Sequence, residues 1–253
     1  MLSTISSKQA KIQESQYIFP YHYLSLHDEL YRRFIHKHYL SLLELVRELS
    51  DIKPGEHILD AGCGDGRFCY EIRNDNANVI GIDYSERAIA FAQAFAPECT
   101  FRCADLTTCY TRPFDKVVNI EVMEHIPPQE LNNFAKSLSG CVKFGGVLVI
   151  SVPSCNIPVT RKHYQHFTPE DLINIFRPWC ELLEIKGHIR ANQWLPWMRR
   201  VSLVRNIWYF KHRIPFANYL MKSIEMKFEK IRLCSAEDSA NIVAVFRRNK
   251  EQL

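Results

Sequence analysis

The apolar residues of the chain fall into short runs that are separated by stretches with helical periodicity. The strand-like runs lie at about 57–61, 78–83, 99–104, 114–120 and 146–152. The helical patterns between them lie at about 66–74, 85–95 and 128–143. This alternation predicts an α/β fold in which parallel strands are joined by right-handed helical crossovers.

A helical pattern also precedes the first strand-like run. Apolar residues recur at helical spacing over 27–50, and the aromatic segment 17–23 before it is broken by Pro20. We expect that segment to be an ordered loop. The sequence therefore predicts an N-terminal extension of loop and helix over residues 1–50.

Two more strand-like runs follow in the C-terminal part of the chain, at 180–188 and 241–246. Thr168 and Pro169 predict the start of a helix before the first of them. About 50 residues separate the two runs, which is too long for a hairpin loop. We therefore predict a core at 51–189, a helical insert at 190–239, and a last strand and tail at 240–253.

The first strand-like run leads into a glycine-rich loop, Asp60-Ala61-Gly62-Cys63-Gly64-Asp65-Gly66. Glycines at alternate positions allow a tight turn and let a ligand approach main-chain N–H groups. The dinucleotide pattern G-x-G-x-x-G is not met, because its third glycine would fall on Arg67. Asp83 follows about 20 residues later, where a carboxylate can accept both hydroxyls of a ribose.

The pattern Asp60-x-Gly62-x-Gly64-x-Gly66 resembles motif I of the class I S-adenosylmethionine (SAM) methyltransferases. The resemblance covers about 55–190 and resumes at about 240–247. It implies a doubly wound, seven-stranded, mostly parallel sheet of the Rossmann-like methyltransferase type, with SAM as cofactor. It also implies that the cofactor is bound by Asp60, Gly62, Cys63, Gly64, Gly66, Asp83, Tyr84, Asp105, Leu106, Ile120 and Glu121.

The segment after the fourth strand reads Glu121-Val122-Met123-Glu124-His125. This pattern resembles the ubiquinone-biosynthesis O-methyltransferases, and also the metal-dependent methyltransferases that modify the 2′-hydroxyl at small-RNA 3′ ends. The second resemblance implies a divalent cation held by Glu121, Glu124, His125 and His163. The same sequence pattern also occurs in relatives that are not regarded as metal enzymes.

Acid–base catalysis is the alternative role for these histidines. An imidazole with a pKa of about 6.5 suits proton removal from a substrate hydroxyl at neutral pH. The candidates for this role are His125, His163 and His166. The third interpretation is that the histidines only order their loops through hydrogen bonds.

The charge of the chain is distributed unevenly. The 253 residues carry a net charge of +4, but the segment 190–232 holds ten basic and two acidic residues, a local net charge of +8. Its aromatic residues include Trp194, Trp197, Trp208, Tyr209 and Phe210. One apolar helix face is predicted from Phe216, Leu220, Ile224, Phe228 and Ile231. The segment is interpreted either as a structural cap or as a contact for an anionic membrane, a phosphate-bearing acceptor or nucleic acid.

Composition narrows the function classes. Apolar residues make up 47% and charged residues 24% of the chain, values typical of a soluble globular protein. No run reaches the roughly 18 apolar residues of a membrane span, and residues 1–16 lack the apolar core of a signal peptide. Nine cysteines without metal-binding spacing favour reduced thiols and a cytoplasmic setting, with contact to the inner membrane face as an option.

The sequence therefore predicts a SAM-dependent methyltransferase that acts on an oxygen of a small-molecule, glycan or lipid-linked acceptor. Two alternatives stay open. One is an RNA 2′-O-methyltransferase with a Glu/Glu/His/His metal site, in which the basic, aromatic insert holds phosphates and stacks bases. The other is a non-catalytic SAM-binding module.

Overall fold

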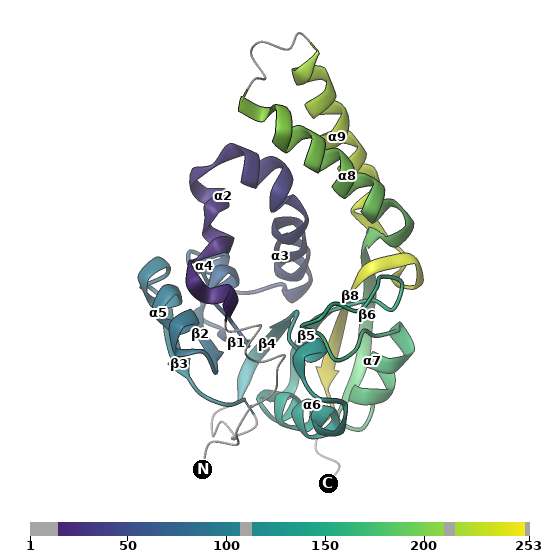
Figure 1. Cartoon of the computed structure of the whole chain (residues 1–253). Helices are drawn as coiled ribbons and strands as arrows, with labels where there is room; N and C mark the ends of the chain where they lie inside the picture. The colour runs from purple at the N-terminus through teal and green to yellow at the C-terminus, as the bar shows by residue number, and fades with distance from the viewer. Residues whose placement is uncertain (1–14, 107–112, 210–215, 251–253) are drawn as a thin grey trace.

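The fold is built around one eight-stranded sheet, seen in the computed structural model of Figure 1, which describes residues 15–106, 113–209 and 216–250. The strand order is β3-β2-β1-β4-β5-β8-β6-β7. The strands are β1 (His57–Ala61), β2 (Asn78–Asp83), β3 (Thr100–Cys103), β4 (Phe114–Ile120), β5 (Val142–Pro153), β6 (Cys180–Arg190), β7 (Leu233–Cys234) and β8 (Ser239–Arg248).

The direction of the strands fixes where a ligand can bind. Strands β3, β2, β1, β4 and β5 are parallel, whereas β8 runs antiparallel to both β5 and β6. The chain order reverses between β1 and β4, and ligands of doubly wound sheets bind beyond the carboxyl ends of strands at such a point. The predicted fold class is confirmed.

Helices cover both faces of the sheet (Figure 1). On one face α3 (Lys37–Ser50), α4 (Arg67–Ile72) and α5 (Glu86–Phe95) pack a core that includes Val46, Phe68 and Ala92. On the other face α6 (Leu131–Gly140) and α7 (Pro169–Phe176) pack a second core that includes Phe134 and Phe176. Apolar side chains that leave water on both faces supply the main stabilisation of such a sheet.

A third core joins the insert to the N-terminal extension. Helices α8 (Ala191–Ile207) and α9 (Ala217–Ile231) pack against each other and against the π-helical turn η3 (Tyr31–Ile35). The ring of Trp197 lies 4.9 Å from that of Phe228, and Phe34 meets Trp208 edge-on. Glu225 accepts two hydrogen bonds from Arg33, so a charged pair on the surface supplements this apolar contact.

The structure differs from the sequence-based expectations in three places. The sheet has eight strands, because the two-residue strand β7 pairs with β6. The expected helix over 27–50 is interrupted: α2 (Leu24–His27) ends at Asp28, whose carboxylate accepts a hydrogen bond from the N–H of Leu30 and so competes with a continuous helix. Phe216, expected on the buried face of α9, is 63% exposed.

Within the described ranges, no helix has the length and apolarity needed to cross a membrane. The aromatic segment 17–23, expected to be an ordered loop, contains part of the turn η1 (Ser15–Ile18) and all of η2 (Tyr21–Tyr23). Residues 1–14, and Phe210, Lys211 and Arg213 of the predicted insert, lie outside the described residues.

Candidate functional site

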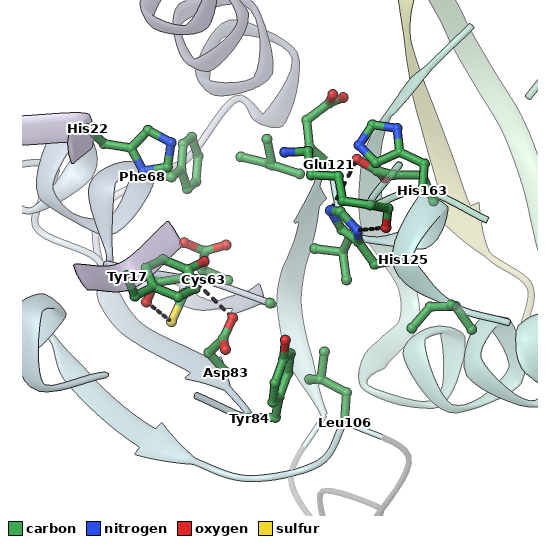
Figure 2. Close-up of a pocket in the computed structure, with 18 of the residues that line it drawn as sticks. Tyr17, His22, Cys63, Phe68, Asp83, Tyr84, Leu106, Glu121, His125 and His163 are labelled. Carbon is green, nitrogen blue, oxygen red and sulfur yellow. Dashed lines mark hydrogen bonds and ion pairs between the residues drawn. The ribbon is translucent and has the colours of Figure 1, made fainter. Parts of the chain in front are cut away.

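A cavity of about 960 Å³ lies at the carboxyl ends of β1, β2 and β4 (Figure 2). Its lining comes from the glycine-rich loop, the end of β2, the segments after β3 and β4, the loop before α7, and the N-terminal extension. It has the size of a ligand pocket, for which roughly 300–1,000 Å³ is usual.

The glycine-rich loop forms one wall of the cavity. Gly62 and Gly64 line it and have φ values of 81° and 54°, which favour glycine because they lie in the left-handed region. The N–H of Gly64 donates to Asp83 Oδ2 at 2.9 Å. Gly66 does not line the cavity: it begins α4 and packs against α5, where a Cβ atom would meet Ala92. The predicted cofactor loop thus combines ligand-facing and packing glycines.

Asp83 ends β2 at the cavity wall, and Tyr84 and Leu106 lie beside it in Figure 2. The N–H of Ser85 donates to Asp83 Oδ1 at 2.9 Å, so both carboxylate oxygens are held in place by main-chain donors. Asp83 is only 6% exposed. Such a fixed carboxylate can accept hydrogen bonds from ligand hydroxyl groups through its remaining lone pairs.

The other predicted cofactor residues surround the same space. Cys63, Asp105 and Ile120 line the cavity together with Asp60, which is 2% exposed. Burial raises the pKa of Asp60 to about 7. The Cys69 thiol donates a hydrogen bond to the Asp60 carboxylate, which partly opposes this rise. The structure therefore brings together all the predicted cofactor residues except Gly66.

The two glutamates after β4 have different partners. Glu121 has a left-handed backbone (φ 55°), and its carboxylate accepts hydrogen bonds from Ser151 on β5 and Asn241 on β8. Burial raises its pKa to about 7. Glu124 is 1% exposed, and its Oε2 has no hydrogen-bond partner among the described residues. Burial, followed by the nearby Glu121 carboxylate, holds the pKa of Glu124 well above its usual range.

Glu124 lies in a cluster with two histidines. One ligand atom from each of Glu124, His125 and His163 lies within 4.8 Å of the others. The Nε2 atom of His125 is 3.8 Å from Glu124 Oε1. Figure 2 shows His125 and His163 on the same side of the cavity. Glu121, the fourth predicted metal ligand, does not belong to this cluster.

Hydrogen bonds define the tautomers of these histidines. Ile157 O can only accept, so His166 carries its proton on Nδ1 and accepts on Nε2 from His163 Nδ1, at 2.8 Å. His125 Nδ1 likewise donates to Lys162 O at 3.1 Å. Each of His125 and His163 therefore keeps a lone pair on Nε2. His166 does not line the cavity. Its hydrogen bond to His163 Nδ1 holds the His163 ring in place.

Burial keeps these imidazoles neutral. It lowers the pKa of His125 to about 4 and that of His163 to about 3, because the imidazolium loses hydration on burial. The pKa of His166 is lowered for the same reason. At neutral pH both Nε2 atoms carry a lone pair that can bind a cation. They are weak proton acceptors unless a neighbouring negative charge, such as an ionised Glu124, stabilises the imidazolium.

The N-terminal extension supplies cavity residues that the sequence did not single out. They are Tyr17, Tyr21, His22, Ile35, His36, His38 and Tyr39. Asp65, within the glycine-rich loop, accepts from His22 Nδ1 at 2.9 Å, and its carbonyl accepts from Tyr23 OH at 3.0 Å. The aromatic composition of 17–23 was the one available signal.

The chain is similar in sequence to known proteins. A family model described as "Methyltransferase domain" matches residues 31–209. The ubiquinone biosynthesis O-methyltransferase of Coxiella burnetii (strain RSA 493 / Nine Mile phase I) is 32% identical over 109 residues, covering 40% of this chain and 45% of that protein. The enzyme of the same name from Bordetella avium (strain 197N) is 28% identical over 121 residues, with 45% and 49% covered. The chain thus spans less than half the length of these relatives.

Solved structures show the same fold. The N-methyltransferase NodS from Bradyrhizobium japonicum WM9, solved with S-adenosyl-L-homocysteine, matches with a TM-score of 0.60 and 16% identity, over 90% of this chain and 99% of that one. Magnesium protoporphyrin IX methyltransferase from Synechocystis PCC 6803, with bound SAM, also gives 0.60 and 16%, over 98% and 100%.

Proposed function

Because the chain belongs to the class I SAM-dependent methyltransferase family, we propose that the acceptor atom of this enzyme is a hydroxyl oxygen of a small-molecule, glycan or lipid-linked acceptor. The proposal rests on the Nε2 atoms of His125 and His163, each of which carries a lone pair beside the cavity. Oxygen transfer requires removal of one proton, and these neutral nitrogens can receive it.

The chain's own residues would position the two reactants. Asp83 would accept the ribose hydroxyls of the cofactor, the N–H groups around Gly62 and Gly64 would face its methionine part, and Asp105 and Leu106 would border its adenine. When bound, SAM supplies a methyl group on a positively charged sulfonium. The acidic lining of this wall suits that charge.

Proton removal would fall to the histidines. His163 would take the hydroxyl proton on Nε2, with His166 holding its ring through the Nδ1 hydrogen bond. The Glu124 carboxyl, when ionised, would stabilise the imidazolium formed beside it. The enzyme would thus supply orientation and one proton acceptor, which together account for large rate effects in other transferases.

A divalent cation is the second candidate role of the same cluster. The support is the convergence of Glu124, His125 and His163 and the unpartnered Glu124 Oε2. Two imidazoles and a carboxylate suit a borderline divalent ion. These three residues would hold the ion and use it to polarise the acceptor oxygen; Glu121, already bonded to Ser151 and Asn241, would complete the set only after a change of rotamer.

Chelation separates the two roles. If the histidines act as bases, the protein dialysed against EDTA keeps full methyl transfer, and His163→Ala loses it. If a metal is required, EDTA abolishes transfer, Mg²⁺, Mn²⁺ or Co²⁺ restores it, and Glu124→Gln loses the metal in elemental analysis. Glu130→Gln, which removes a carboxyl at the cavity wall outside the cluster, is the matched control and should leave metal content unchanged.

The acceptor is tested directly with isotope-labelled SAM. The protein is incubated with lipid, glycan and RNA fractions of cells, and the methylated product is identified by mass spectrometry. Label on an oxygen in the lipid or glycan fraction supports the proposal. Label confined to RNA supports the RNA 2′-O-methyltransferase alternative.

We also propose a peripheral contact between the helices α8 and α9 and an anionic membrane. Three aromatic side chains at the distal ends of these helices are largely exposed: Tyr209 (77%), Phe216 (63%) and Tyr219 (77%). Within the described part of the chain, Arg199, Arg205 and Lys222 form no ion pair there. Exposed aromatic rings beside unpaired bases suit the interface of an anionic bilayer.

A further inference from the structure

One side of the cavity is formed by residues without a role in the proposed cofactor site. They belong to the N-terminal extension and to α8, and the principal ones are Tyr21, His22, His36, His38, Tyr39 and Met198. Figure 2 shows His22 across the cavity from His125 and His163. A ligand between them would therefore have the proposed proton acceptors on one side and this wall on the other.

The wall presents a rigid stack of rings. The ring of His22 lies 3.9 Å from that of Tyr21 and 4.2 Å from that of Tyr39, and it is nearly parallel to Tyr39 (16°). Asp65 fixes the orientation of His22 through the 2.9 Å contact with Nδ1. Fixed aromatic faces bind the flat or apolar face of another ring at little cost in conformational entropy.

The same wall contains two buried imidazole nitrogens. The Nδ1 atoms of His36 and His38 are buried without a hydrogen bond to any described residue. Burial lowers the pKa of both imidazoles to about 4, so they are neutral at neutral pH and can both donate and accept hydrogen bonds. These Nδ1 atoms have almost no accessible surface, so a hydroxyl group reaches them only after a small rotation of the imidazole rings. A hydroxyl then complements them, because it also donates and accepts.

The carboxyl groups of the cavity disfavour an anionic acceptor. Among the described residues that line it, the carboxyl groups are those of Asp60, Asp83, Asp105, Glu121, Glu124 and Glu130. Lys162 is the one lysine or arginine in that lining. The raised pKa values of Asp60, Glu121 and Glu124 reduce this negative charge, but the other three carboxyl groups still outnumber Lys162. An anionic acceptor would therefore lose hydration with a single base available to pair with it.

From these contacts we infer that the Tyr21–His22–Tyr39 stack, with His36, His38 and Met198, is the acceptor subsite, and that it takes an uncharged ring bearing hydroxyl groups. Sugars and phenols share this chemistry. The inference rests on the proposed function and narrows it, because any phosphate or other negative charge of the acceptor must stay outside the cavity.

The test measures ring binding without requiring turnover. The whole protein is saturated with S-adenosylhomocysteine, and saturation-transfer NMR is recorded with two uncharged rings, methyl β-glucoside and catechol. Their charged counterparts are glucose 1-phosphate and 3,4-dihydroxybenzoate. We expect transfer to at least one uncharged ring and little to its charged counterpart; which ring responds distinguishes the sugar from the phenol.

Variants locate the binding. Tyr39→Leu should weaken the signal roughly fivefold, the usual effect of losing one aromatic contact, and His36→Leu should weaken it through the lost hydrogen bond. Phe144→Leu removes an exposed ring from β5 outside the cavity lining and should bind as wild type. The inference is overturned if neither uncharged ring binds, if the charged rings bind as well, or if both cavity variants behave as wild type. Calorimetry with SAM on the same proteins tests the proposed function separately, because SAM binding without ring binding overturns the subsite alone.

Discussion

Asp83 is the residue on which the cofactor assignment depends most directly. Its carboxylate is fixed by Gly64 and Ser85 at the cavity wall. We expect Asp83→Ala to weaken SAM binding by about ten- to a hundredfold, since a hydrogen bond to a charged group contributes about 1.5–3 kcal/mol. Isothermal calorimetry measures the change.

The control for this variant is Asp238→Ala, which removes a carboxylate from the turn before β8, outside the cavity lining. Equal SAM affinity of wild type and Asp83→Ala would remove the ribose assignment. A thermal melt of each variant separates loss of the contact from loss of the loop, because the same carboxylate also orders the glycine-rich loop.

Single residues were predictable where local sequence determines them. Asp60, Gly62, Gly64 and Asp83 end strands or begin turns, and the structure brings them to one wall. The different partners of Glu121 and Glu124 were not predictable. They depend on the left-handed backbone at Glu121 and on Ser151 and Asn241, which come from strands far along the chain.

At the scale of elements, the junction of α4 and α5 depends on one glycine. Gly66 has φ 78°, and an added Cβ would lie 2.6 Å from Ala92 Cβ and 3.0 Å from its Cα. We expect Gly66→Ala to lower the free energy of unfolding by about 1–3 kcal/mol more than Gly145→Ala, because overpacking adds to the backbone strain. Gly145 has φ 77° with nothing within 4 Å, so it reports strain alone.

Urea denaturation of the two variants measures this difference. Equal losses of stability would mean that α5 moves away at little cost and that Gly66 is required only for its backbone conformation. In that case the packing argument for the third glycine of the loop is wrong.

A buried histidine links β6 to α3. His188 is 1% exposed, and its Nε2 contacts Ser41 Oγ at 2.8 Å. Burial lowers its pKa to about 3, below the unfolded value of 6.5. Its contribution to stability is therefore complete above pH 6.5 and is lost as the pH falls towards 3, by about 1.4 kcal/mol for each pH unit.

The measurement is urea unfolding at pH 7.5, 6 and 5. The unfolding free energy should fall less steeply below about pH 6.5 in His188→Gln than in the wild type. The difference in slope should correspond to roughly one bound proton. His57→Gln, which changes an exposed histidine on β1, is the control and should follow the wild-type slope. An unchanged slope in His188→Gln contradicts the argument.

Elements with a strong local pattern were predicted well. Strands β1, β2 and β4 and helix α7 with its Thr168 cap lie close to their predicted bounds. The interruption of the helix over 27–50 was missed because periodicity continues through it, whereas Asp28 and the packing of η3 on the insert decide the backbone. Strand β7 is too short to have a pattern of its own.

At the scale of the whole molecule, α8 and α9 lie at one end, away from the sheet (Figure 1). Replacing Arg199, Arg205 and Lys222 together with glutamine should weaken binding to anionic liposomes by up to about a hundredfold, since each base near such a surface contributes about 1 kcal/mol. SAM affinity should stay within about twofold, because these residues do not line the cavity.

Co-sedimentation with vesicles containing phosphatidylserine measures the effect, and added salt should weaken the wild-type binding. The matched control replaces three exposed bases of the core, Arg87, Lys136 and Arg177, with glutamine. If both triple variants bind alike, the attraction comes from net charge and the insert is a structural cap.

The contacts between η2 and the glycine-rich loop have a consequence for how the two reactants bind. His22 and Tyr23 bond to Asp65, and Arg67 donates to the carbonyl of His22. The proposed acceptor wall is thus bonded to Asp65, in the glycine-rich loop, and to Arg67, the first residue of α4. A movement that widens one compartment would strain these contacts, so we expect binding of the acceptor and binding of the cofactor to be coupled.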